Sequence, residues 1–228
     1  MKLANFVPDG NLGRSTADRV SEILRQAIVG RVFEAGERLV EAKIAQELDV
    51  SITPVRQAFS NLATHGLLTV FPYKGSYVTI LTQESITDLA FIRRQIEVLA
   101  ADRSFKNLKP EDCKQLTNIC KLSDYHLQAG DLYQSIHYDR LFHEFFVTRA
   151  DSPLLMEMWN LIKNRLEYSQ TFTKRVDPPE DYIQRRHEPI IRAIESMDKE
   201  AFMDATQNHI SSAMSLKFFP SEADIQYK

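Results

Sequence analysis

The stretch from Leu39 to Leu67 constrains the fold of this chain more than any other. It reads LVEAKIAQELDVSITPVRQAFSNLATHGL, with apolar residues at helical spacing on both sides of a short polar break, Asp49-Val50-Ser51. Pro54 falls in the first turn of the second segment, where its missing N–H is tolerated. Gly66 is a typical helix-ending residue. The pattern predicts a helix from about Glu41 to Leu48, a sharp turn, and a second helix that ends at Gly66.

The residues on either side of this pair complete a winged helix. A preceding helix is expected to begin at Ser15 or Thr16, either of which can cap it, and to end at Gly30. It has an apolar face made of Val20, Ile23, Leu24, Ala27 and Ile28. After a link with a turn at Gly36, LLTVFPYKGSYVTIL at 67–81 reads as two short strands around the turn Pro-Tyr-Lys-Gly. We therefore predict a winged helix-turn-helix domain over residues 10–80.

The character of the chain changes after Leu81. Strand-like alternation disappears, and Gly130 is the only glycine between residues 82 and 217. Breaks such as Lys109-Pro110 and Asp177-Pro178-Pro179 separate helical segments. These segments are expected near 84–106, 110–129, 131–149, 153–174, 180–196 and 198–217. The fold class is thus mainly α: a winged helix with a small hairpin, then an all-α antiparallel bundle over 84–217, and a tail at 218–228.

Composition excludes some classes and leaves DNA binding open. Residues 1–80 hold 9 Lys+Arg and 8 Asp+Glu, a net charge of +1, and residues 81–228 hold 19 and 23, a net charge of −4. A local basic face suffices for phosphate contact, so these counts do not decide the matter. The chain contains neither an apolar run of about 20 residues nor a secretion signal. Cys113 and Cys120 are interpreted as free thiols, and a cytoplasmic location is expected.

The run from Gly36 to Val78 resembles the GntR family of bacterial transcription regulators. The resemblance is carried by Gly-Glu-Arg-Leu at 36–39, by Val-Ser-x-Thr-Pro-Val-Arg at 50–56, by Gly66-Leu67 before the wing, and by a glycine at the wing tip. It covers residues 15–80 with strong motifs. Over residues 84–217 weaker motifs resemble the FadR subgroup, whose all-helical part is called the FCD domain. The resemblance implies a DNA-binding regulator whose second domain binds an effector.

Seven residues are candidates for DNA contact. Hydroxyls and free N–H groups at a helix N-terminus suit phosphate oxygens, and an arginine can bind guanine O6 and N7 together. A cation and a tightly turning glycine suit a wing beside the minor groove. The predicted DNA-binding residues are Arg38, Lys43, Ser51, Thr53, Arg56, Lys74 and Gly75. The structural alternative is that Arg56 pairs with a surface acid.

The chain departs from the family pattern at two positions. Ile52 stands where the family usually has arginine, and Ala42 stands at a position that is often basic, with Lys43 beside it. Each missing base contact would cost about 1–3 kcal/mol of discrimination. The operator sequence is therefore expected to differ from that of typical members, with Ile52 contacting a thymine methyl as one hypothesis.

Four residues of the helical segment are candidates for one metal site. Asp139 and His143 are four residues apart and so share a helix face. His187 and His209 lie on the last two predicted helices, which an antiparallel bundle can bring beside the first. Three imidazoles and a carboxylate suit a divalent ion, with zinc preferred and nickel, manganese, iron or cobalt as alternatives. All four fall where the resembled family has its metal ligands, although an Asp-x-x-x-His pair on an apolar helix is often purely structural.

The remaining predictions concern the effector and the type of activity. In the resembled family the pocket binds small organic acids, and Arg93 matches a position that commonly faces it. The alternative is a surface pair between Arg93 and Glu97, and Arg165 is a second cavity candidate. No catalytic residues are assigned, because no general base accompanies the ligands and Glu144 would project off their face. The rival functions are a metal-only sensor and a metal-dependent hydrolase.

The sequence thus predicts a regulator and not an enzyme. Two copies would bind a palindromic double-stranded DNA operator, and a small carboxylate at the metal would change their affinity. Repression is the expected sign, and no membrane partner is expected.

Overall fold

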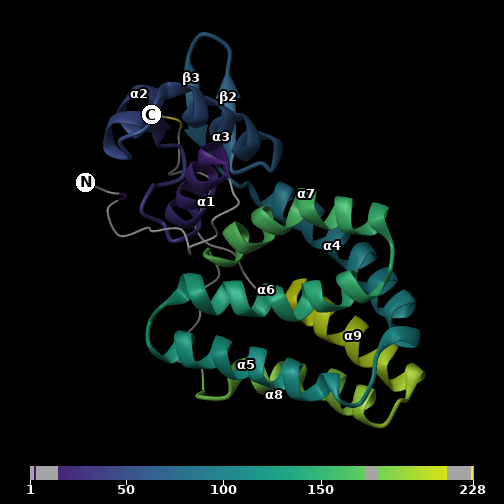
Figure 1. Cartoon of the computed structure of the whole chain (residues 1–228). Coiled ribbons are helices and arrows are strands. Elements are labelled where there is room, and N and C mark those ends of the chain that lie inside the picture. Colours follow the sequence, from purple (N-terminus) through teal and green to yellow (C-terminus); the bar gives the residue numbers. More distant parts are fainter. Residues whose placement is uncertain (1–2, 4–14, 173–178, 215–226, 228) are drawn as a thin grey trace. The chain divides into compact units, whose positions relative to one another are not determined.

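The computed structural model describes residues 3, 15–172, 179–214 and 227, which form two compact units (Figure 1). Within the described residues, the first unit contains 3, 15–82, 164–171 and 227, and the second contains 83–163, 172 and 179–214. Helices dominate, and the strands form one small antiparallel sheet. The predicted fold class, a winged helix-turn-helix followed by an all-helical part, is confirmed.

The helices of the first unit follow the predicted pattern closely. They are α1 (Thr16–Val29), α2 (Glu41–Glu47) and α3 (Ile52–Thr64). Ser15 caps α1 through a capping box with Asp18, each side chain accepting the other residue's backbone N–H. The predicted apolar face of α1 is buried, and α3 buries Val55, Ala58, Phe59 and Leu62. Both α1 and α2 pack on α3, which places the start of α3 beside the turn.

The sheet has three strands, one more than the predicted hairpin. The strands are β1 (Arg38–Leu39), β2 (Leu68–Phe71) and β3 (Gly75–Val78), in the order β1-β3-β2. The hairpin pairs Leu68 with Val78 and Phe71 with Gly75. Strand β1 lies in the segment predicted to be an extended link, and it pairs antiparallel with β3. A two-residue strand has too little alternation to be visible in sequence.

The second unit is a helical body. It is built from α4 (Gln83–Ser104), a short 3-10 helix η1 (Phe105–Asn107), α5 (Asp112–Gln128), α6 (Leu132–Arg149), the first part of α7 (Pro153–Gln170), α8 (Tyr182–Glu195) and α9 (Lys199–Met214). Helices α5 and α6 pack against each other, α8 packs on α5 and α9, and α4 packs on α6 and α9 (Figure 1). This arrangement brings the inner faces of α4, α6, α8 and α9 together.

Helix α7 is the element whose assignment differs most from the prediction. It ends at Gln170 instead of near residue 174, and its last part, from Asn164 on, belongs to the first unit together with Thr171. Within that unit, Arg25 Nη1 lies 2.5 Å from Glu167 Oε2, and the Tyr168 hydroxyl donates to the backbone oxygen of Thr79. The predicted ends at 173–174 and 215–217, and all of the tail at 218–228 except Tyr227, lie outside the described residues.

Across the part of the chain that the structure describes, no helix is both long and apolar enough to cross a membrane.

Candidate metal centre and DNA-binding surface

Three buried histidines meet inside the second unit. His143 comes from the middle of α6, His187 from α8 and His209 from α9, and each is less than a tenth exposed. One nitrogen of each ring lies within 4.8 Å of the corresponding nitrogens of the other two. The sequence placed these three side chains on different helices, and the packing of those helices brings them together.

Asp139 adds a carboxylate to the same cluster. It lies one turn before His143 on α6 and is buried. Its Oδ1 is 3.7 Å from His187 Nε2, and its Oδ2 is 4.0 Å from His143 Nε2. The two Nε2 atoms are 3.5 Å apart. All four side chains that the sequence predicted as metal ligands therefore converge on one small volume.

The outer ring nitrogens fix the tautomer of each histidine. His187 Nδ1 is 2.8 Å from the backbone oxygen of Ile183, and His209 Nδ1 is 3.1 Å from that of Arg186. His143 Nδ1 is 2.7 Å from Glu97 Oε2. Carbonyl and carboxylate oxygens only accept, so each Nδ1 must carry the proton. A neutral imidazole then has its lone pair on Nε2, the nitrogen on the inner side.

This donor set fits a divalent cation. Lone pairs of His143 and His187 face each other beside the Asp139 carboxylate, an arrangement that a cation would stabilise. Tetrahedral zinc at its usual bond lengths needs donor atoms about 3.3 Å apart, so the separations of 3.5, 3.7 and 4.0 Å among His143, His187 and Asp139 would each have to shorten by less than about 1 Å. Three nitrogens and one oxygen would leave a fifth position open on an ion that accepts one.

Burial keeps His187 and His209 uncharged, as metal ligation requires. Burial lowers the pKa of His187 to about 4, against the opposing attraction of Asp139. Burial, followed by the neighbouring His187 and His143, holds the pKa of His209 well below its usual range. At neutral pH both rings are neutral and offer a lone pair.

Glu97 and Arg93 on α4 form a buried pair next to the cluster. Arg93 Nε lies 2.5 Å from Glu97 Oε1, and their side chains are 11% and 4% exposed. Burial alone would raise the pKa of Glu97, but Arg93 and His143 outweigh it and lower that pKa to about 2. Glu97 is therefore a carboxylate at neutral pH. The pair exists, as one sequence interpretation held, but it is buried and not on the surface.

The two arginines predicted to bind effector lie in different places. Arg93 is close enough to Asp139 and His209 to act on both electrostatically, so its guanidinium borders the cluster. The Arg165 guanidinium instead lies directly over Gly66, within the first unit. No described contact joins Arg165 to the histidines, and we leave it out of the candidate site.

Asp124 is a structural residue that sequence reasoning missed. This buried carboxylate on α5 accepts the backbone N–H of Ile183 at 2.7 Å and that of Gln184 at 3.0 Å. It thereby caps the first turn of α8 from another helix, whereas Asp181, at the usual cap position, makes no capping hydrogen bond. The capped turn includes Ile183, whose carbonyl holds His187.

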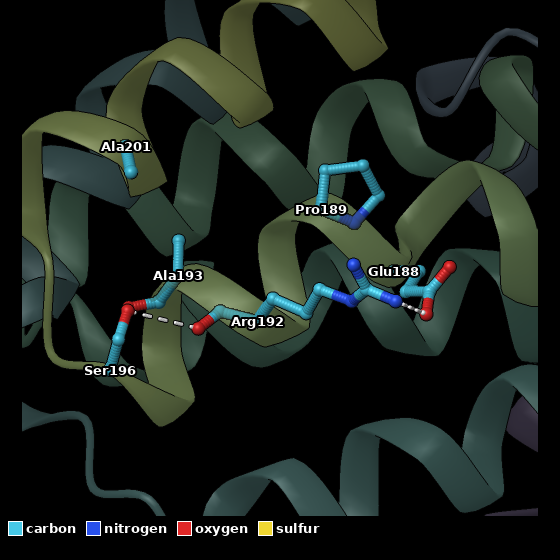
Figure 2. Close-up of a pocket in the computed structure, with 6 residues that line it drawn as sticks. All are labelled: Glu188, Pro189, Arg192, Ala193, Ser196 and Ala201. Atoms are coloured by element: carbon cyan, nitrogen blue, oxygen red, sulfur yellow. Dashed lines mark hydrogen bonds and ion pairs between the residues drawn. The ribbon is translucent and has the colours of Figure 1, made fainter.

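A shallow hollow is lined by α8 and the start of α9. It encloses about 300 Å³ and is lined by Glu188, Pro189, Arg192, Ala193, Ser196 and Ala201 (Figure 2). Glu188 and Arg192, neighbours on α8 that both line it, form an exposed ion pair at 2.6 Å. None of the four clustered side chains lines this hollow, which is therefore separate from the candidate metal site.

The predicted DNA-binding residues all belong to the first unit, and Arg38, Lys43, Ser51, Thr53, Arg56 and Lys74 are exposed. Ser51 precedes α3 and makes no capping hydrogen bond with its side chain. Arg56 is 68% exposed, and its Nε donates to Glu41 Oε2 at 3.2 Å. The surface-acid contact considered in the sequence thus exists. An exposed ion pair of this kind is weak and can be exchanged for a phosphate or base.

The wing has a left-handed tip. Gly75 adopts φ 110°, and a Cβ there would lie 3.1 Å from the guanidinium Nε of Arg38. Tyr73 has φ 63° and is fully exposed next to Lys74. The tip therefore presents an aromatic ring and a cation together, and the tyrosine was not among the predicted contacts.

These features define a class of protein: a winged helix-turn-helix DNA binder joined to a helical body with a histidine-rich cluster. The gntR-family model for bacterial regulatory proteins matches residues 16–78, and the FCD domain model matches residues 88–212. The chain belongs to the GntR family and carries an FCD domain. It is a transcription regulator and not an enzyme.

Characterised relatives support the same assignment. The HTH-type transcriptional repressor RspR of Escherichia coli (strain K12) is 29% identical over 198 residues, or 84% of each chain. The gluconate operon transcriptional repressor of Bacillus subtilis (strain 168) is 30% identical over 191 residues, covering 81% of this chain and 78% of the relative. Both relatives are named as repressors.

Solved structures share the fold. A GntR transcriptional regulator from Rhodococcus sp. RHA1 matches with a TM-score of 0.74 and 26% identity, over 89% of this chain and 97% of that one. McbR/YncC of E. coli matches with a TM-score of 0.72 and 24% identity, over 89% and 96%.

Proposed function

We propose that this protein is a transcriptional repressor whose affinity for its operator is controlled by a small organic acid bound at a zinc site in the FCD domain. The observation that carries the proposal is the convergence of Asp139, His143, His187 and His209: one nitrogen of each ring lies within 4.8 Å of the other two, and the carboxylate lies 3.7 Å from His187 and 4.0 Å from His143. Nickel, manganese, iron or cobalt are alternatives for the ion, because the ligand types do not select among them.

The effector is proposed to be a carboxylate. A metal ion held by four protein donors can accept an oxygen ligand at a further position. Arg93 borders the cluster, and its contact with Glu97 uses Nε, one of five N–H donors on a guanidinium. An acid bound to the ion would lie close to this cation, which supports charge-assisted recognition.

DNA binding is proposed to require two copies of the chain. Helix-turn-helix dimers bind half-sites related by two-fold symmetry, so we expect a palindromic operator. The second unit has exposed apolar side chains at helical spacing on two helices: Phe91, Ile92 and Leu99 on α4, and Leu154, Met158 and Leu161 on α7. Such surfaces are typical of subunit contacts. The activity would take place in the cytoplasm, where bacterial DNA lies.

Within each copy, we propose that DNA is contacted by the seven predicted residues of the first unit. Ser51 and Thr53 at the start of α3 would bind phosphate, Arg56 would reach a base edge, and Lys74 and Gly75 would follow the minor groove. Arg38 and Lys43 would add backbone contacts. Effector binding would then shift the equilibrium between two arrangements that differ in DNA affinity.

A thermal-shift screen of small carboxylates, with and without chelator, tests the sensing half. A ligand at about 100 times its dissociation constant adds about 2.7 kcal/mol of stability. We expect an acid to raise the melting temperature only when zinc is present. A shift that persists in chelator would place the acid elsewhere and contradict the proposal.

DNA release tests the link between the two halves. An operator selected from a random duplex library would be bound in zinc, and the acid found in the screen would then be added. We expect release of the duplex. Release caused by zinc addition or removal alone would instead favour a metal-only sensor. Retained zinc in the double variant His143→Ala/His209→Ala would refute the metal site.

A further inference from the structure

We propose that Glu97, anchored by Arg93, is the residue that orients His143 for metal binding, so that helix α4 is tied to the metal site through a carboxylate–histidine contact. The proposal deepens the function above and depends on its metal site. Glu97 was absent from the ligands predicted from sequence.

The geometry of Glu97 suits positioning and not ligation. Its Oε2 lies 2.7 Å from His143 Nδ1, the outer nitrogen of the ring. The nitrogen that faces Asp139 and His187 is Nε2. A carboxylate that holds Nδ1–H fixes both the tautomer and the rotation of the ring, and it increases the basicity of the ligating nitrogen.

The three histidines differ in what holds their outer nitrogens. His187 and His209 are each held by a backbone carbonyl, of Ile183 and of Arg186 respectively. The carbonyl that holds His187 lies one turn earlier on the same helix, and the one that holds His209 lies on the neighbouring helix α8. Among the three, His143 alone depends on a side chain, so its orientation can be changed by substitution.

Arg93 gives Glu97 its fixed position. Glu97 uses Oε1 for Arg93 Nε at 2.5 Å and Oε2 for His143, and its side chain is 4% exposed. A buried carboxylate destabilises the folded protein unless it is paired with a cation and hydrogen-bonded. Each oxygen therefore has a defined partner, and the carboxylate plane is set by two contacts from two helices.

The arrangement has a consequence for regulation. Helix α4 starts at Gln83, the first residue of the second unit, directly after Thr82, where the N-terminal segment of the first unit ends. A change at His143 that moves Glu97 therefore acts on the helix that continues the chain from the DNA-binding unit. The contact between His143 and Glu97 joins the cluster to α4 directly, and Arg93 on the same helix acts electrostatically on Asp139 and His209.

The test compares the full-length protein with Glu97→Gln and with the double variant Arg93→Met/Glu97→Leu. The double variant removes both buried charges together, so neither is left unpaired. Glu144→Gln is the matched control: it removes a carboxylate from the residue next to His143 that pairs instead with Arg140 and Lys163. Circular dichroism establishes that each variant is folded.

Two measurements decide the outcome. Competition with a chromophoric chelator gives zinc affinity, which should fall roughly 10- to 100-fold in both Glu97 variants and stay within twofold in the control. Nitrogen-15 spectra of the zinc-free protein give the ring tautomer of His143, which should be protonated at Nδ1 in the wild type and become mixed in the variants.

The two proposals fail separately. If the wild type binds zinc and the Glu97 variants bind it equally well with an unchanged His143 tautomer, the positioning role is refuted and the metal site stands. If the wild type binds no zinc, the metal site fails, and an unchanged tautomer in Glu97→Gln would refute the positioning role as well. An equal loss of zinc affinity in Glu144→Gln would also refute the positioning role of Glu97.

Discussion

Replacing Asp124 with alanine should destabilise the helical body and weaken metal binding at the same time. The Asp124 carboxylate is 3% exposed and accepts two N–H groups of the first turn of α8, from Ile183 and Gln184. A buried donor left without a partner costs about 1–3 kcal/mol, and loss of a helix cap typically costs about 1 kcal/mol. We therefore expect a total loss of about 2–4 kcal/mol.

The loss can be measured by heat or by denaturant. In a chain of 228 residues, each kcal/mol lowers the melting temperature by about 2–4 °C, so the transition of the helical body should move down by roughly 5–15 °C. Zinc affinity should fall as well, because fraying of the first turn releases the Ile183 carbonyl that holds His187 Nδ1. Differential scanning calorimetry with and without zinc gives both effects.

Asp181→Ala is the matched control for this experiment. Asp181 occupies the usual cap position of the same helix, but it makes no capping hydrogen bond and pairs with Arg185 on the surface. Its removal should change neither the melting temperature nor zinc affinity appreciably. The reasoning is wrong if Asp124→Ala melts within 1–2 °C of the wild type, a shift worth less than about 1 kcal/mol, or if the control is equally damaging.

Three other predictions concern the DNA-binding unit and the buried histidines. Arg56→Ala should weaken operator binding at least about fivefold, which corresponds to the low end of about 1–3 kcal/mol for a base contact. Glu41→Gln, which frees Arg56 from its acid, should strengthen binding; fluorescence anisotropy measures both, and equal loss in the two would count against base contact. Gly75→Ala should lower wing stability by about 1–2 kcal/mol in chemical denaturation, since φ is 110° and Arg38 is close; an unchanged midpoint would disprove the strain. Burial lowers the pKa of His187 from 6.5 to about 4, so protonation of this ring opposes folding. The free energy of unfolding of the zinc-free protein should therefore fall by up to about 3 kcal/mol between pH 6.5 and pH 4. Urea titrations measure this, and His187→Gln should make the pH dependence flatter.

Features encoded by neighbouring residues were predictable. The buried face of α3, the capping residue of α1 and the turn of the wing all follow from helical spacing, Ser15 and the glycine at 75. Local propensity and burial agree at these positions, so tertiary packing does not override the pattern. The four clustered side chains were also predicted as a group, but only Asp139 and His143 could be paired from their spacing.

Features that depend on distant residues were not predictable. The sequence linked Glu97 only to Arg93 at i, i+4, because nothing local indicates that α6 brings His143 Nδ1 to its other oxygen. The cap of α8 by Asp124 spans about 60 residues, and β1 forms only because β3 is available as a partner. In each case the partner is chosen by packing, which a single sequence does not display. A polar residue within an apolar run, such as Glu97 in Ile-Glu-Val-Leu, is the one local indication of a buried role.

The discontinuous make-up of the first unit has a consequence for how the protein is made. Residues 164–171 are synthesised more than 80 residues after the wing, at roughly 5–20 residues per second. Until they leave the ribosome, Arg25 lacks the carboxylate of Glu167 and Thr79 lacks the hydroxyl of Tyr168. A nascent chain that stops after residue 82 therefore cannot reach the final packing of its DNA-binding unit, and that unit is complete only once most of the helical body has been translated.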